Sequence, residues 1–134
     1  MIRILVADDH SMVRRSILAL LGEDDDIRVV GEASNGKEAV ELAKELDPDL
    51  VIMDISMPRM DGITATENLQ SLYDELKIII LSMHANQGLV ELARRKGASG
   101  YLLKKSVANE LLPAIYQVYE GGEYLSDSLA PSNS

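Results

Sequence analysis

The chain has 134 residues, of which 46% are hydrophobic and 26% are charged, and its formal net charge at pH 7 is −9. This composition is typical of one globular domain, and the negative charge argues against direct nucleic-acid binding, which depends on Lys and Arg. The absence of cysteine excludes disulfides and thiolate zinc sites. Because the sequence shows neither a signal-peptide pattern nor an apolar stretch near the ~20 residues of a membrane span, we expect a cytoplasmic protein without membrane partners.

Short apolar runs alternate with longer amphipathic segments along the chain. The apolar runs predict strands at residues 2–7, 27–33, 50–53, 77–81 and 100–103. Apolar residues at helical spacing predict helices that open near Ser11 and Asn35 and at residues 63–72, 86–96 and 107–119. Pro113 lies inside the last helix, so we expect a kink or a late helix start there. The alternation predicts an α/β fold whose parallel sheet is covered on both faces.

Polar side chains follow four of the predicted strands. Asp8 and Asp9 follow the first strand, Asp54 the third, Ser82 the fourth and Lys104 the fifth. Open α/β sheets bind ligands at the carboxyl ends of their strands, so these side chains are expected in one crevice. Three clustered carboxylates repel one another, which calls for a cation, and a hard one such as Mg²⁺ fits. A strand-end aspartate such as Asp54 can also attack phosphorus and form an aspartyl-phosphate.

Each of these residues also has an ordinary structural explanation when taken alone. Asp54 or Asp9 could cap a following turn or helix. Ser82 could equally be a helix N-cap, and Lys104 an exposed loop residue. Their shared position at the ends of strands favours a common site.

These residues, in this order, resemble those of a known family. Asp8-Asp9, Asp54, Ser82 and Lys104, with the string Met53-Asp-Ile-Ser-Met-Pro58 and the downstream Gly62, are similar to the receiver domain of two-component response regulators. The resemblance implies a flavodoxin-like, doubly wound (βα)5 fold with five parallel strands in the order 2-1-3-4-5. It places this domain at residues 1–121 and leaves 122–134 as a linker or tail, of which residues 130–134 are small and polar.

The resemblance also implies a role for each matching residue. Asp54 would be the phosphoacceptor, taking its phosphoryl group from a phosphohistidine on a sensor histidine kinase. Asp9, Asp54 and the backbone carbonyl of Ser56 would ligate Mg²⁺ or Mn²⁺, with Asp8 acting through water. The phosphate-sensing and switch residues would be Ser82, Tyr101 and Lys104. On phosphorylation Ser82 would move toward the phosphoryl oxygens and Tyr101 would turn into the space it leaves, although simple packing at a sheet edge is another explanation for Tyr101.

Two stretches indicate a subfamily, and one residue departs from the family pattern. Leu81-Ser-Met-His-Ala85 and Gly97-Ala-Ser-Gly-Tyr-Leu-Leu-Lys104 are most similar to receivers of the NarL/FixJ (LuxR-type) subfamily, which carry a C-terminal helix-turn-helix domain. This similarity implies transcription regulation, DNA contact only through an output domain absent from this chain, and a homodimer on phosphorylation. We therefore expect a piece of a longer protein, with a stand-alone receiver as the alternative. Receivers commonly have a cis-bonded Pro after the site lysine, where this chain has Lys105, so the shape of that loop stays open.

Two other function classes are alternatives to a non-enzymatic signalling switch. A Mg²⁺-dependent phosphatase of the haloacid dehalogenase type also uses a strand-end aspartate nucleophile. Such enzymes usually carry a second aspartate two residues later, where this chain has Ser56. A flavodoxin-like binder would need a Gly/Ser/Thr-rich phosphate loop after the first strand, and none follows it.

Overall fold

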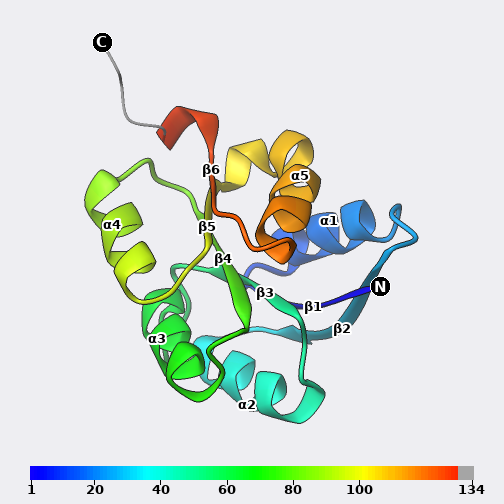
Figure 1. Ribbon diagram of the computed structural model, residues 1–134, viewed down its shortest axis with the longest axis horizontal. Coiled ribbons are helices and arrows are strands. Elements are labelled where there is room, and N and C mark those ends of the chain that lie inside the picture. Colours follow the sequence, from blue (N-terminus) through cyan, green and yellow to red (C-terminus); the bar gives the residue numbers. More distant parts are fainter. Residues whose placement is uncertain (130–134) are drawn as a thin grey trace.

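The computed structural model describes residues 1–129 of the chain. At its centre lies a sheet in which every neighbouring pair of strands is parallel (Figure 1). The strands are β1 (Ile2–Ala7), β2 (Ile27–Ala33), β3 (Leu50–Asp54), β4 (Lys77–Ser82), β5 (Gly100–Leu103) and β6 (Tyr124–Leu125). Their spatial order is β2-β1-β3-β4-β5-β6, which confirms the predicted order 2-1-3-4-5 and the doubly wound α/β fold and adds one short edge strand.

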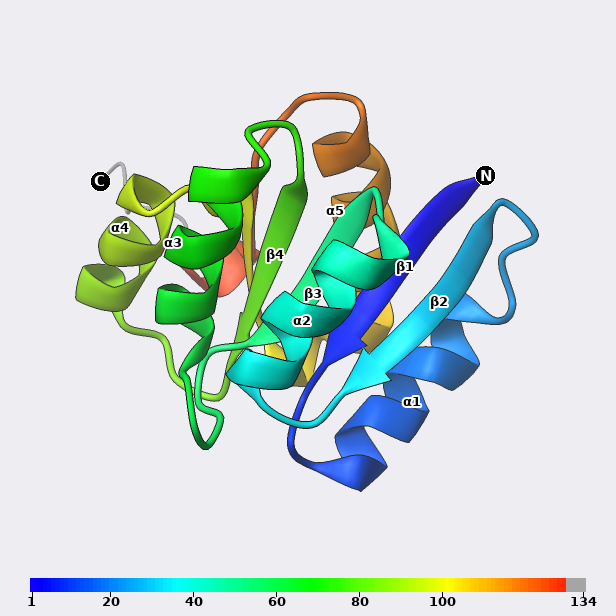
Figure 2. The same cartoon turned by 90° about the horizontal axis from the view of Figure 1, so that it is seen from below.

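Helices cover both faces of this sheet (Figures 1 and 2). The α-helices are α1 (Ser11–Leu21), α2 (Gly36–Leu46), α3 (Gly62–Leu72), α4 (Gln87–Arg95) and α5 (Val107–Tyr119). Two short 3₁₀ helices, η1 (Lys104–Ser106) and η2 (Asp127–Leu129), lie before α5 and after β6. Among the described residues, no helix has both the length and the apolar character that a membrane crossing requires.

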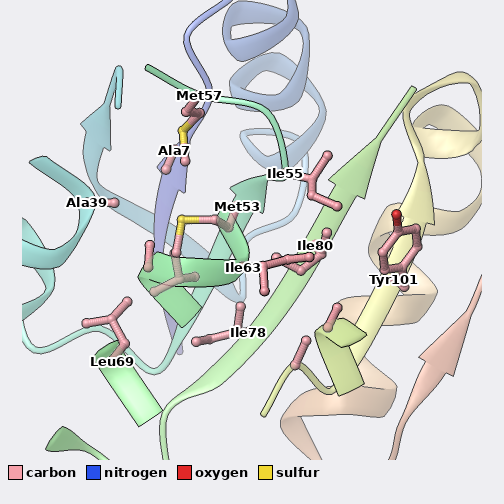
Figure 3. Close-up of a cluster of buried hydrophobic side chains, with 14 of the residues drawn as sticks. Ala7, Ala39, Met53, Ile55, Met57, Ile63, Leu69, Ile78, Ile80 and Tyr101 are labelled. Carbon is pink, nitrogen blue, oxygen red and sulfur yellow. The ribbon is translucent and has the colours of Figure 1, made fainter. Parts of the chain in front are cut away.

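The sheet separates two hydrophobic clusters. Ile4 and Val6 of β1 belong to the cluster beneath α1 and α5, whereas Leu5 and Ala7 belong to the one beneath α2, α3 and α4. Figure 3 shows part of the second cluster, into which the ring of Tyr101 points. Since successive side chains of a strand face opposite sides, the continuous apolar runs seen in the sequence are explained by burial on both faces.

The ends of the helices match their local sequence signals. The Asn35 side chain accepts a hydrogen bond from the Glu38 amide at 2.8 Å, and the Glu38 carboxylate accepts one from the Ser34 amide at 2.9 Å. This arrangement is close to a capping box, although Glu38 accepts its hydrogen bond from the residue before the N-cap and not from the N-cap itself. The late helix start expected near Pro113 is wrong, because α5 begins at Val107 and continues through this exposed proline.

The predicted sheet lacked β6, a strand of two residues that carries no hydrophobic period of its own. The β6 segment pairs with β5, and Ser126 just after it donates its amide to the Tyr101 carbonyl at 3.0 Å. Leu129 is fully buried, and its carbonyl accepts a hydrogen bond from the Gln87 side chain at 2.7 Å. Packing therefore continues past the boundary expected at residue 121, while the expectation for residues 130–134 lies outside the described part of the chain.

Candidate functional site

Three of the predicted site residues meet at the carboxyl edge of the sheet. Asp8 follows β1, Asp54 ends β3 and Lys104 follows β5. The Lys104 ammonium lies 3.0 Å from Asp8 Oδ2 and 3.1 Å from Asp54 Oδ2. Asp8 is fully buried and Asp54 is 2% exposed, so this ion-pair cluster is shielded from bulk water.

The strand register brings these residues together. Ala7 of β1 lies opposite Met53 of β3, which places the following residues, Asp8 and Asp54, at the same level of the sheet edge. The start of α3 also fits tightly here, because a side chain at Gly62 would overlap the carbonyl oxygen of Asp54. The Gly62 amide donates to the Ile55 carbonyl at 2.9 Å and so fixes the turn that follows Asp54.

Asp9 and His10 complete the cluster. His10 Nδ1 lies 3.2 Å from Asp9 Oδ1, 3.3 Å from Asp8 Oδ1 and 3.9 Å from Asp54 Oδ2. One potential ligand atom from each of these four residues lies within 4.8 Å of the others. No role for His10 was predicted, and its position directly after two aspartates is the signal that could have suggested one.

The charges within this cluster do not balance. Burial, and then the negative charge of Asp8, raise the pKa of Asp54 from 3.8 to about 6 despite the nearby ammonium. Burial alone would lower the pKa of Lys104, but hydrogen bonds and charge attraction from Asp8 and Asp54 outweigh it and raise that pKa. One ammonium therefore faces three carboxylates, and the site favours additional positive charge.

The donor atoms fit a hard divalent cation. Asp8 Oδ2 and Asp54 Oδ2 are buried, and the Lys104 ammonium contacts both as an ion pair. Carboxylate oxygens are the ligand type that Mg²⁺ and Mn²⁺ prefer, and ligand atoms of Asp8, Asp9 and Asp54 lie within 4.8 Å of one another. Ser56 lies beside them, since its amide hydrogen bonds with Asp54 Oδ1 at 3.3 Å.

The two remaining predicted residues lie near this edge but do not contact the carboxylates. Ser82 ends β4, and its hydroxyl is bonded within its own loop, accepting from the His84 amide at 3.1 Å and donating to the His84 carbonyl at 3.2 Å. Tyr101 of β5 is 2% exposed, and its hydroxyl has no hydrogen-bond partner in the described part of the chain (Figure 3). Burial raises the pKa of Tyr101. The movement of Tyr101 expected on phosphorylation stays a prediction.

Comparison with known protein families matches residues 4–116 to the response regulator receiver domain. The chain belongs to this family. Two curated relatives of this receiver domain are the nitrate/nitrite response regulator protein NarL of Escherichia coli K12, with 41% identity, and the transcriptional regulatory protein LiaR of Bacillus subtilis, with 43% identity. The matches cover 96% and 97% of this chain but 59% and 62% of those relatives, so the chain spans about three fifths of their length.

Solved structures of receiver domains share the fold. A LuxR-family two-component response regulator from Aurantimonas sp. SI85-9A1 has a TM-score of 0.92 at 34% identity, covering 96% of this chain and 92% of that one. The signal receiver domain of the putative response regulator NarL from Mycobacterium tuberculosis has a TM-score of 0.85 at 34% identity, covering 90% and 97%. The expected resemblance to NarL and LuxR-type receivers is thus confirmed.

Proposed function

We propose that Asp54 accepts a phosphoryl group from a phosphohistidine of a sensor histidine kinase. The observation that supports this most is the buried triplet in which the Lys104 ammonium contacts Asp8 and Asp54 at 3.0 and 3.1 Å. A carboxylate held at a strand end beside an ammonium is both a nucleophile and part of a cradle for phosphate oxygens. In this role the chain is a substrate that assists its own modification, and not an enzyme with turnover.

The transfer is an in-line displacement at phosphorus. A carboxylate oxygen of Asp54 forms a bond to phosphorus while the bond from phosphorus to the donor nitrogen breaks. The donor imidazole keeps the electron pair of the broken bond, and Asp54 becomes an acyl phosphate. The Lys104 ammonium neutralises part of the charge on the phosphoryl oxygens, which is the main contribution expected in phosphoryl transfer.

A divalent cation belongs to this proposal. Mg²⁺ or Mn²⁺, when bound by Asp9, Asp54 and the Ser56 carbonyl, with Asp8 acting through water, supplies positive charge for the incoming phosphoryl group. The Lys104 ammonium and the Ser56 amide favour the deprotonated form of Asp54, whereas burial raises its pKa. The grouping of ligand atoms from Asp8, Asp9 and Asp54 within 4.8 Å of one another supports this assignment.

The added charge is the switch signal. Phosphorylation brings about −1.5 to −2 charges and three acceptor oxygens. The Ser82 hydroxyl would leave its bonds to the His84 backbone for a phosphoryl oxygen, and Tyr101 would turn into the space that Ser82 leaves. We place the resulting change at the face formed by α4, β5 and α5, which the segment at 124–129 partly covers.

The output of this switch is proposed from the relatives. NarL and LiaR are named as a response regulator and a transcriptional regulatory protein, and one neighbour is described as RcsB dimers bound to DNA, matched at 27% identity. We propose cytoplasmic transcription regulation through a DNA-binding domain outside this chain, with a homodimer on phosphorylation. A stand-alone receiver is the alternative. The phosphatase alternative loses support, because the chain belongs to the receiver family and has Ser56 where a second aspartate would be needed.

Mass spectrometry of the intact chain after incubation with acetyl phosphate and Mg²⁺ tests the proposal. The unmodified sequence is expected to gain the mass of one phosphoryl group, and Asp54→Asn is expected to gain none. Asp25→Asn is the matched control, because Asp25 is an exposed aspartate in the turn after α1 and should leave the adduct unchanged. An adduct that persists in Asp54→Asn at the level of the unmodified sequence would reject Asp54 as the acceptor.

A further inference from the structure

His10 occupies a helix-cap position without acting as a cap. It is the residue before α1, with extended backbone angles, yet its side chain makes no capping hydrogen bond. Ser, Thr, Asp and Asn usually fill this position because their side-chain oxygens accept amide hydrogen bonds. The imidazole instead turns toward the carboxylates, with its Nδ1 atom 3.2 Å from Asp9 Oδ1 and 3.3 Å from Asp8 Oδ1.

The spacing of these atoms fits neighbouring ligands of one metal ion. Two ligands at right angles around an ion with bonds of about 2.0–2.1 Å lie about 3 Å apart. Among the proposed direct ligands, Asp9 Oδ1 lies 3.2 Å from His10 Nδ1, close to this value, and Asp54 Oδ2 lies 3.9 Å from it. The backbone amide of His10 donates to Asp8 Oδ1 at 2.8 Å, so the residue is held in place by its own main chain.

A second observation is the excess of negative charge in this cluster. Asp8 and Asp54 are buried, and Lys104 is the lysine that contacts both of them, at 3.0 and 3.1 Å. The side chain of His10 is 60% exposed at the mouth of the cluster, so an entering ion would meet it first.

We propose that Nδ1 of His10 is a direct ligand of the divalent ion at this site and makes the site select transition-metal ions over Mg²⁺. The inference rests on the proposed function, because it concerns the same acidic pocket. Mg²⁺ binds oxygen ligands and gains little from imidazole, whereas Fe²⁺, Ni²⁺, Cu²⁺ and Zn²⁺ accept imidazole nitrogen readily. To bind a metal ion through Nδ1, the neutral ring would carry its proton on Nε2.

Pulsed electron paramagnetic resonance of Mn²⁺ bound to the 134-residue chain tests this proposal. We expect the nuclear modulation of a directly bonded nitrogen, which disappears in His10→Ala. The matched control is His84→Ala, since His84 is the other of the chain's two histidines and should leave the signal intact. By titration calorimetry, His10→Ala is expected to weaken Ni²⁺ binding about tenfold and Mg²⁺ binding less than about twofold, because imidazole is a good ligand for Ni²⁺ and a poor one for Mg²⁺.

The outcomes separate this proposal from the phosphoacceptor proposal. Bound Mn²⁺ without nitrogen modulation, or equal losses of Ni²⁺ and Mg²⁺ affinity in His10→Ala, would overturn the role of His10 even if acetyl phosphate still modifies Asp54. A nitrogen signal that survives in His10→Ala but vanishes in His84→Ala would overturn it as well. Failure of the phosphoacceptor proposal would instead show as an unmodified chain in the acetyl phosphate experiment, whatever the Mn²⁺ spectrum.

Discussion

Replacing Lys104 by methionine tests how far the fold depends on the buried ammonium. The Lys104 side chain is 6% exposed and contacts Asp8 and Asp54, whose side chains are 0% and 3% exposed. Removing one partner of a buried ion pair costs about 3–5 kcal/mol, because the remaining charges stay desolvated and unpaired. The lower end applies here, since Asp54, with a pKa of about 6, can take up a proton instead. We therefore expect Lys104→Met to lower the free energy of unfolding by about 3 kcal/mol at pH 7.5 without divalent ions.

Urea unfolding followed by circular dichroism, with EDTA and then with excess Mg²⁺, measures this effect. Lys105→Met is the matched control, because Lys105 is exposed and forms no ion pair in the described part of the chain. We expect Mg²⁺ to recover part of the loss in Lys104→Met, since a bound cation neutralises the same carboxylates. Equal unfolding midpoints for Lys104→Met and Lys105→Met in EDTA would refute the reasoning that the ammonium compensates these charges.

Three further predictions concern pH, the C-terminal segment and the turn after Asp54. In EDTA the folded chain keeps the Asp54 proton up to about pH 6, whereas the unfolded chain releases it near pH 3.8. The free energy of unfolding should therefore fall by about 3 kcal/mol as the pH rises through that window. Urea unfolding at different pH values should show this fall in the unmodified sequence and not in Asp54→Asn, and a rise would contradict it. Ser126→Ala removes the hydroxyl that accepts a hydrogen bond from the buried Leu103 amide at 3.1 Å, so we expect the free energy of unfolding to fall by about 1–3 kcal/mol in thermal unfolding. The exposed Ser16→Ala is the control and should change it by almost nothing. Equal effects would argue against the packing of the segment at 124–129 on β5. Gly62→Ala should lower the free energy of unfolding by about 1–3 kcal/mol and weaken labelling by acetyl phosphate, because the new methyl group would overlap the Asp54 carbonyl. Unchanged stability and labelling would count against this close approach.

The elements of the fold were largely predictable because their signals are local. Leu50–Asp54 and Lys77–Ser82 are buried on both sides, so each appears in the sequence as an uninterrupted apolar run ending in a polar residue. Tyr124–Leu125 was missed because a two-residue strand has no period, and it forms only through pairing with β5 far back in the chain. Pro113 led to the opposite error, because a late helix start was expected there whereas α5 begins at Val107 and continues past this exposed proline.

The residues placed by the backbone at the ends of strands could be predicted from the sequence. The directions of individual side chains could not. Parallel strands place their carboxyl ends at one edge, which was enough to bring Asp8, Asp54 and Lys104 together. The direction of the His10 ring depends on the loop before α1, and the interior position of Tyr101 depends on the space beneath α4. Both follow from tertiary packing, which one sequence does not reveal.

The central claim is that Asp54 carries the phosphoryl group. Reduction with borohydride converts a phosphorylated aspartate to homoserine, and peptide sequencing by mass spectrometry then locates the converted residue. After acetyl phosphate and Mg²⁺ treatment we predict homoserine at position 54 and none at Asp8 or Asp9. Homoserine at Asp8 or Asp9, with position 54 unchanged, would contradict the account.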